Sequence, residues 1–136
     1  MNQDYCADRI ELQDLLLNYA AAVDERDIER YRACFTDDVE VINFGTQTYN
    51  GRDAWVNYVW NALEKYSATQ HLLGPQFARI DGDIARTRCD VQAVHFLSGE
   101  QGRFTLWATY HTDMRRSNAR WLICRHELQV CGSSSD

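Results

Sequence analysis

Apolar residues recur at helical spacing near the start of the chain, over residues 7–23. Steps of three and four predict an amphipathic helix whose apolar stripe faces a core. The stripe consists of Ile10, Leu12, Leu15, Leu16, Tyr19, Ala20 and Val23. The helix should end at the carboxylate Asp24, and Asp27 is the expected N-cap of a short second helix over 28–35.

Two short strands and a third helix are expected next. The predicted elements are a turn at 36–38, strands at 39–44 and 47–49, and a helix at 54–66. Asn50-Gly51 is a strong turn signal, and Asp53 is expected to cap the third helix. Trp55 and Tyr58 belong to the apolar stripe of that helix.

After Tyr66 the pattern changes to the alternation typical of strands. Four long strands are predicted, at 69–80, 84–97, 102–115 and 119–130. Short connections rich in turn residues predict an antiparallel meander. Gly74-Pro75 interrupts the first of these strands, which predicts a bulge or bend that curves the sheet.

Helices followed by a long sheet indicate an α+β fold. We expect a cone-shaped, curved antiparallel sheet of about six strands wrapped around the N-terminal helices and enclosing a hydrophobic pocket. With 136 residues, the chain is expected to form a single domain over 1–131, followed by a flexible tail at 132–136.

Charge and targeting signals narrow the class of partner. The net charge is −6 and the 14 basic residues are scattered, which argues against nucleic acid or an anionic membrane as a partner. Neither a signal peptide nor an apolar stretch of membrane-spanning length is evident, so a cytoplasmic location is expected.

The five cysteines cannot all pair within one chain, and none forms a CxxC motif. Cys34, Cys89 and Cys124 fall inside apolar patterns, where a reduced cysteine acts as a small hydrophobe. The histidines form neither an HExxH motif nor a close cluster with cysteines, so no metal site is expected.

Several segments, taken in order, resemble the SnoaL-like branch of the nuclear transport factor 2-like superfamily. They are LLLNYAAAVDERD, YRACFTDDVEV, NGRDAWVNYV, TQHLLG, IDGDIARTRCDVQAVH and RWLICRHEL. Together they span nearly the whole chain. Relatives include dehydratases, dehydrochlorinases, isomerases, cyclases and epoxide hydrolases, beside non-catalytic subunits and binding proteins.

The resemblance to dehydratase and dehydrochlorinase members extends to single residues. Those proteins pair an aspartate at the end of the first helix with a histidine at the start of the third strand, which Asp24 and His71 match. Tyr19 matches a tyrosine of bile-acid-dehydratase-like members, and His95 a second histidine of scytalone-dehydratase-like proteins. Arg125 falls where dehydrochlorinase-like members have an arginine on the last strand.

These residue types suit an elimination beside an acidified C–H bond. In this interpretation His71 is the base, because the reference pKa of histidine, about 6.5, lies near working pH. Asp24 fixes its tautomer and stabilises the imidazolium. Tyr19 would contact a substrate carbonyl or enolate, and His95 or Arg125 would assist the leaving group or hold an anion. No cofactor is needed.

Each residue also has a purely structural interpretation. Asp24 could be an exposed helix end and His71 a core or rim histidine, while Tyr19 and His95 could be core residues. Arg125 could lie on the polar side of the sheet, paired with an acid. Two further histidines, His111 and His126, are expected on the outer face. Trp55 and Tyr58, aromatics that suit either a core or an interface, are assigned to the pocket lining as substrate contacts.

The leading hypothesis is a cofactor-independent lyase of the dehydratase type. Its substrate would be a hydrophobic, cyclic small molecule such as a polyketide, terpenoid or steroid-like compound. An isomerase or cyclase that uses the same dyad is the nearest alternative. Other classes are a small-molecule-binding module, a subunit resembling the β subunit of ring-hydroxylating dioxygenases, and a domain that serves mainly as a platform for dimers. A homodimer or higher homo-oligomer is compatible with all of them.

Overall fold

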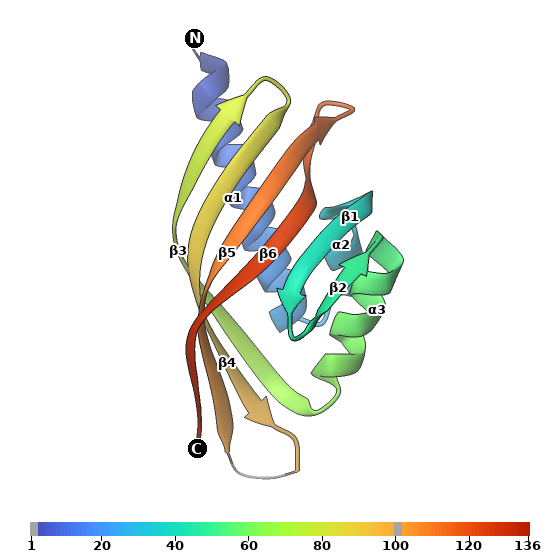
Figure 1. The fold of residues 1–136 in the computed structure, drawn as a ribbon, viewed down its shortest axis with the longest axis vertical. Coiled ribbons are helices and arrows are strands. Elements are labelled where there is room, and N and C mark those ends of the chain that lie inside the picture. Colours follow the sequence, from blue (N-terminus) through green and yellow to red (C-terminus); the bar gives the residue numbers. More distant parts are fainter. Residues whose placement is uncertain (1–2, 100–101) are drawn as a thin grey trace.

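The computed structural model describes residues 3–99 and 102–136, which form three helices and six strands (Figure 1). In chain order these are α1 (Gln3–Asp24), α2 (Ile28–Arg32), β1 (Phe35–Phe44), β2 (Gln47–Asn50), α3 (Arg52–Leu63), β3 (Tyr66–Asp81), β4 (Ile84–Leu97), β5 (Arg103–Ser117) and β6 (Arg120–Ser135). The fold is therefore α+β, as predicted.

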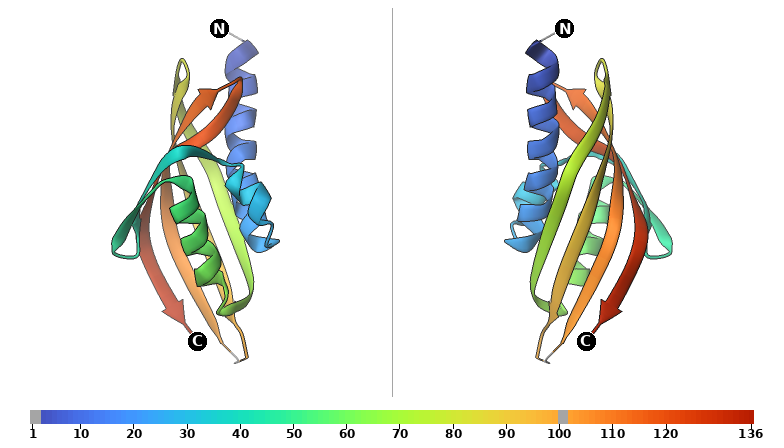
Figure 2. Two further views of the ribbon diagram at one scale, coloured as in Figure 1. Left: turned by 90° about the vertical axis from the view of Figure 1, so that its right-hand side faces the viewer. Right: turned by 90° about the vertical axis from the view of Figure 1, so that its left-hand side faces the viewer.

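The strands form one sheet in the order β2-β1-β6-β5-β4-β3. The sheet is strongly curved, and the helices lie within its curve, with α1 against β3 and α3 against β1 (Figure 2). The sheet is mixed rather than wholly antiparallel, because β1 and β6 pair in parallel. The chain can make that parallel pairing because α3 and three long strands separate the two elements.

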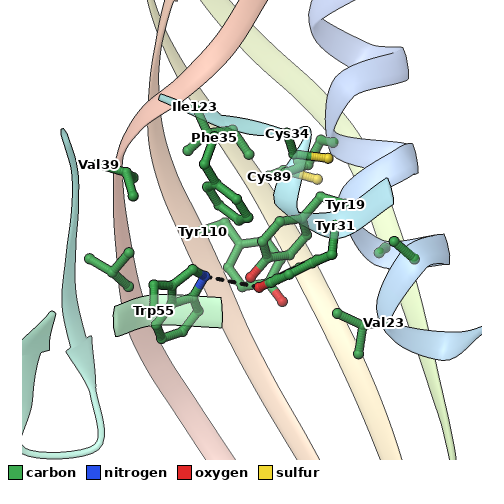
Figure 3. Packing of buried hydrophobic residues seen from close by; sticks show 14 of the residues in the cluster. Tyr19, Val23, Tyr31, Cys34, Phe35, Val39, Trp55, Cys89, Tyr110 and Ile123 are labelled. Atoms are coloured by element: carbon green, nitrogen blue, oxygen red, sulfur yellow. Dashed lines mark hydrogen bonds between the residues drawn. The ribbon is translucent and has the colours of Figure 1, made fainter. Parts of the chain in front are cut away.

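The core forms where the apolar stripe of α1 meets the inward residues of the sheet. Leu12, Leu16, Tyr19 and Val23 of α1 are buried, and β4 alternates regularly between exposed and buried positions. Aromatic rings from α1, α2, α3 and β5 meet at the centre of this core (Figure 3). Trp55 Nε1 donates a hydrogen bond to Tyr31 Oη over 3.0 Å, which satisfies a buried donor.

Irregularities fall at the expected turns. The register of β3 against β4 shifts between Leu73 and Gln76, so the bulge predicted at Gly74-Pro75 is confirmed. The hairpin from β5 to β6 turns at Asn118 and Ala119, both with positive φ (52° and 64°), as in a type I′ turn. The predicted connection at 98–102 lies partly outside the described residues.

The N-terminal half departs from the sequence prediction at two places. The turn expected at 36–38 belongs instead to β1, because Phe35 pairs with Ile123 of β6 and tertiary pairing overrides the local turn preference. The third helix begins at Arg52 with Gly51 as its N-cap. Asp53 provides no cap and instead forms a 2.7 Å ion pair with Arg32.

The C-terminal end also differs from its prediction as a flexible tail. Residues from Gly132 to Ser135 continue β6 and pair with β5, where Trp107 faces Gly132 and Phe104 faces Ser135. Backbone hydrogen bonds with Arg103 extend the pairing to Asp136. This polar segment is a strand because β5 is long enough to pair with it.

All five cysteines are free thiols, and Cys34 and Cys89 are buried in the core. Burial raises the pKa of the Cys34 thiol to about 11, so it stays protonated near neutral pH. Among the described residues, no helix has the length and apolar character that crossing a membrane would require.

Two isoleucines on strands, one buried in the core and one exposed, provide a test of this core. Ile123 is 0% exposed, so Ile123→Ala should lower the free energy of unfolding by about 2–5 kcal/mol, through lost burial and the cavity left behind. Ile84 is 43% exposed, and Ile84→Ala, the matched control, should cost less than about 1 kcal/mol. Urea unfolding measures both, and equal losses would contradict this description of the core.

Candidate active site

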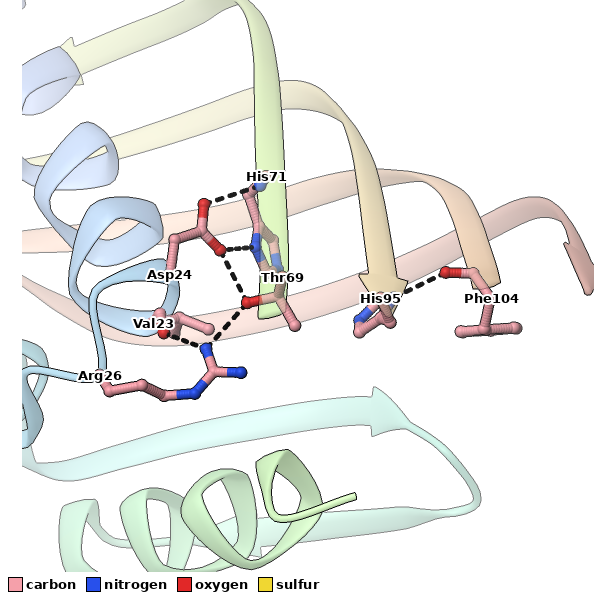
Figure 4. A network of polar contacts seen from close by, with 7 residues as sticks. All are labelled: Val23, Asp24, Arg26, Thr69, His71, His95 and Phe104. Carbon is pink, nitrogen blue, oxygen red and sulfur yellow. Dashed lines mark hydrogen bonds and ion pairs between the residues drawn. The ribbon is translucent and has the colours of Figure 1, made fainter. Parts of the chain in front are cut away.

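The C-terminal end of α1 and the first part of β3 meet through Asp24 and His71 (Figure 4). Asp24 Oδ1 lies 2.8 Å from His71 Nδ1, and Asp24 Oδ2 accepts the backbone N–H of His71 over 2.8 Å. The two side chains are 21% and 10% exposed, respectively. The predicted proximity of these residues, 47 positions apart, is confirmed.

The contact with Asp24 selects one tautomer of His71. A carboxylate only accepts hydrogen bonds, so the imidazole must carry its proton on Nδ1. When the ring is neutral, Nε2 is the unprotonated nitrogen, and no hydrogen bond within residues 3–99 and 102–136 reaches it. The pair thus has the arrangement of an imidazole base with a carboxylate that orients it.

Hydrogen bonds also determine the ionisation state of Asp24. Burial raises the pKa of this carboxyl group, but the hydrogen bonds from the His71 ring, the His71 backbone and Thr69 outweigh burial. The net effect holds the pKa of Asp24 below its ordinary value. Asp24 is therefore a carboxylate at neutral pH.

Two residues beside the pair, Thr69 and Arg26, were not among the sequence candidates. The Thr69 hydroxyl donates to Asp24 Oδ1 over 3.0 Å, and Arg26 Nη1 lies 2.9 Å from Thr69 Oγ1. Thr69 is two residues from His71 on the same strand, so strand periodicity could have indicated it. The contact of Arg26 depends on the path of the chain after α1, which no sequence motif reports.

His71 lines a cavity of about 220 Å³ between the sheet, α1 and α3. Its walls are mainly aromatic and aliphatic, as is typical of small-molecule sites. The lining residues are Tyr19, Val23, Tyr31, Phe44, Trp55, Tyr58, Val59, Ala62, Leu63, Lys65, Tyr66, His71, Ala93, His95, Leu106, Tyr110 and Leu128. Five of the predicted site residues, namely Tyr19, Trp55, Tyr58, His71 and His95, therefore meet at one cavity.

His95 also has a defined tautomer. Its Nδ1 lies 3.1 Å from the carbonyl oxygen of Phe104, which can only accept, so Nδ1 carries the proton. Burial lowers the pKa of His95, which keeps the ring neutral near pH 7. The centroids of the His71 and His95 rings are 6.1 Å apart. The cavity wall thus carries two imidazoles, both protonated at Nδ1.

Tyr19 lines the cavity with its ring but is only 3% exposed. Its hydroxyl lies 2.9 Å from His126 Nε2, and His126 Nδ1 lies 2.8 Å from Thr112 Oγ1. Burial raises the pKa of Tyr19 well above its ordinary value, so the hydroxyl stays protonated. The contact of Tyr19 with a substrate remains a prediction.

The assignment of His126 to the outer face is wrong, because this residue is fully buried beneath Tyr19. The register between β5 and β6 shifts where Asp113 pairs with Arg125 and Met114 pairs with Ile123. The extra residue reverses the alternation along β6 and turns His126 inward. Burial lowers the pKa of His126 to about 3.

Arg125 does not reach the cavity that His71 lines. Its side chain contacts Glu127 at 3.2 Å and Glu40 at 3.6 Å, on the side of the sheet opposite His126. The structure therefore places Arg125, a predicted substrate contact, away from this cavity, and its contacts match the alternative interpretation of a polar-face residue paired with acids. The same bulge that turns His126 inward directs Arg125 outward.

Two other hollows do not combine His71 with an aromatic lining. A hollow of about 430 Å³ between the N-terminal part of α1, β3 and β4 is lined by several arginines, including Arg79, Arg86 and Arg88, and contains neither His71 nor Asp24. A second, of about 540 Å³ between α1 and β3, is lined by both Asp24 and His71 but by no aromatic residue. Within the described part of the chain, no group of three or more His, Cys, Asp or Glu residues could hold a metal ion.

A curved sheet closed by helices around an aromatic cavity, with His71 at its wall, defines a cone-shaped α+β fold. The SnoaL-like domain family matches residues 4–127. The chain therefore belongs to the SnoaL-like family, within the nuclear transport factor 2-like superfamily.

Similar proteins support this assignment. An uncharacterised protein of Mycobacterium tuberculosis is 30% identical over 132 residues, covering 92% of this chain and 86% of the relative. A scytalone dehydratase-like protein of Novosphingobium aromaticivorans superposes with a TM-score of 0.92 at 20% identity, covering 98% of this chain and 91% of the other. A hexachlorocyclohexane dehydrochlorinase, LinA type 2, gives 0.89 at 22% identity, with coverages of 98% and 91%. At these identities the structures show a shared fold.

The buried His126 makes the stability of the fold depend on pH. Its pKa is about 3 when folded and about 6.5 when unfolded, so the unfolded chain binds a proton that the folded chain does not between these values. Stability should fall as the pH drops from about 6.5 toward 3. His126→Gln should make this dependence shallower by about 1.4 kcal/mol per pH unit.

Urea unfolding of both proteins between pH 6 and 4 measures the difference. His111→Gln is the matched control, because His111 contacts Gln129 at the exposed face of the sheet, and it should leave the slope unchanged. An unchanged slope in His126→Gln would contradict the burial of a neutral imidazole.

Proposed function

We propose that this protein is a cofactor-independent lyase that eliminates water or HX from a compact, hydrophobic cyclic molecule. The observation that carries the proposal is the 2.8 Å contact between Asp24 Oδ1 and His71 Nδ1, with His71 at the wall of an aromatic cavity. The similarity in fold to a scytalone dehydratase-like protein and a dehydrochlorinase supports the same class of reaction.

In the proposed reaction, Nε2 of His71 removes a proton from a carbon next to a carbonyl or another activating group. The electron pair of that C–H bond forms the new double bond, and the bond to the leaving group on the adjacent carbon breaks. Asp24 stabilises the imidazolium through Nδ1–H while the charge is present. The imidazolium then returns its proton to the departing hydroxide, which leaves as water, or to solvent when the leaving group is a halide.

The cavity supplies complementary hydrogen-bonding groups. In their neutral forms His71 and His95 have an unprotonated Nε2 that can accept, and the lining residues Tyr58 and Tyr66 carry hydroxyls that can donate. In the proposal, His95 accepts a hydrogen bond from a substrate hydroxyl, and a tyrosine hydroxyl donates to the carbonyl or enolate oxygen. A cyclic β-hydroxy ketone meets these requirements.

The volume of the cavity restricts the size of the substrate. At about 220 Å³ it is smaller than the range of about 300–1,000 Å³ that is usual for drug-sized ligands. This size favours a molecule of one or two rings. A four-ring, steroid-like substrate would need the cavity to open further between α3 and the sheet.

The proposal predicts that the dyad is required for turnover. His71→Gln removes the base, and Asp24→Asn removes the carboxylate that fixes its tautomer, so each should lower kcat by at least about a hundredfold. Turnover of a panel of one- and two-ring β-hydroxy ketones, followed by the ultraviolet absorbance of the conjugated enone product, measures the effect.

The control for this experiment is His111→Gln, at a histidine outside the cavity, which should retain full activity. Circular dichroism would establish that each variant is folded. Full turnover in folded His71→Gln and Asp24→Asn would place the chemistry elsewhere. Binding of panel compounds without turnover in the wild-type protein would favour the binding-module alternative.

A further inference from the structure

A continuous set of hydrogen bonds leads from Arg26 through Thr69 to Asp24, and chemistry fixes every direction in it (Figure 4). A guanidinium can only donate, so Thr69 Oγ1 accepts from Arg26 Nη1. A carboxylate can only accept, so the single hydroxyl proton of Thr69 must point to Asp24 Oδ1. Thr69 therefore cannot rotate its proton away without losing one of these bonds.

Arg26 occupies an unusual backbone position for an arginine. The N–H groups of Asp27 and Arg26 bond to the carbonyls of Ala22 and Val23, which is the Schellman arrangement at a helix C-terminus. The backbone of Arg26 must then adopt the left-handed conformation, with φ at 58°, a position where glycine is the usual residue. The strained backbone directs the guanidinium back toward β3.

The side chain of Arg26 is held at several points. Nη1 donates to the Val23 carbonyl over 2.6 Å as well as to Thr69 over 2.9 Å. Nη2 is buried and has no hydrogen-bond partner among the described residues. A strained backbone and an unsatisfied buried donor are both unfavourable for stability alone, and such features concentrate at functional sites.

We infer that Arg26 and Thr69 are positioning residues, which hold the Asp24 carboxylate aligned with Nδ1 of His71. Their effect on catalysis rests on the function proposed above, whereas their effect on the geometry of the pair can be measured without turnover. Oδ1 receives two donors, the Thr69 hydroxyl and the His71 ring, and Oδ2 receives the backbone N–H of His71. Removing the Thr69 hydroxyl leaves Oδ1 with the imidazole alone.

Other charged or titratable groups face the pair from each side. His95, Tyr66 and Lys65 line the cavity beside His71. Asp14, Glu25 and Arg30 line the hollow between α1 and β3, where Glu25 and Arg30 pair with each other at 3.0 Å. Within the described residues, none of these groups forms a hydrogen bond or ion pair with the carboxylate of Asp24, which leaves Thr69 as its donor besides His71.

The test compares Thr69→Val, which keeps the shape and removes the hydroxyl, with Thr69→Ser, which keeps the hydroxyl. Imidazole ¹⁵N shifts report the tautomer of His71, and the ¹³C shift of the Asp24 carboxyl reports its titration. In Thr69→Val we expect a measurable Nε2–H tautomer of His71 and an Asp24 midpoint moved to higher pH, because a donor to the carboxylate is lost. Thr69→Ser should match the wild-type protein.

Arg26→Gly provides an independent arm, since glycine adopts the left-handed turn without strain and removes the guanidinium. It should produce the same spectral changes as Thr69→Val while the unfolding temperature stays equal or rises. Wild-type spectra in both Thr69→Val and Arg26→Gly would overturn the inference. Equal changes in Thr69→Ser and Thr69→Val would also overturn it, because packing rather than the hydroxyl would then be responsible.

Discussion

The carboxylate of Asp24 joins the end of α1 to a strand at the edge of the sheet. The N–H of His71 points away from β4. Because β3 is an edge strand, no other strand can accept this N–H, so it needs another partner. Asp24 satisfies that N–H with one oxygen and binds the His71 ring with the other. The same group therefore fixes the helix against the sheet and the imidazole against the cavity, so the site cannot be separated from the packing of the fold.

The cavity is likewise continuous with the core. Tyr19, Tyr31, Trp55 and Tyr110 are buried core residues and also line the cavity wall. Ring contacts hold them together, with centroids 5.2 Å apart for Tyr19 and Tyr31 and 5.6 Å apart for Tyr19 and Tyr110. Because close-packed rings move little, the position of each hydroxyl is set by the fold before a ligand binds.

Sequence periodicity predicts the buried face of an element correctly where the environment of that element repeats regularly along the chain. The stripe of α1 and the alternation of β4 could be predicted because each depends only on which face meets the core. The assignment of His126 to the outer face failed because one bulge in β6 reverses the alternation, and the register of a bulge depends on the partner strand. The resemblance to known families supplied the Asp24–His71 pairing, but Arg26 and Thr69, 43 residues apart, meet only through tertiary structure.

The two histidines of the cavity show how similar side chains can receive different roles. Both carry their proton on Nδ1, but His71 donates it to a carboxylate and His95 to the Phe104 backbone carbonyl. A carboxylate stabilises an imidazolium much more than a neutral carbonyl does, and burial lowers the pKa of His95. Within the proposed reaction, this difference assigns proton removal to His71 and leaves His95 as a neutral acceptor. In that proposal, the partner of each Nδ1 atom, rather than the imidazole itself, determines which ring serves as the base.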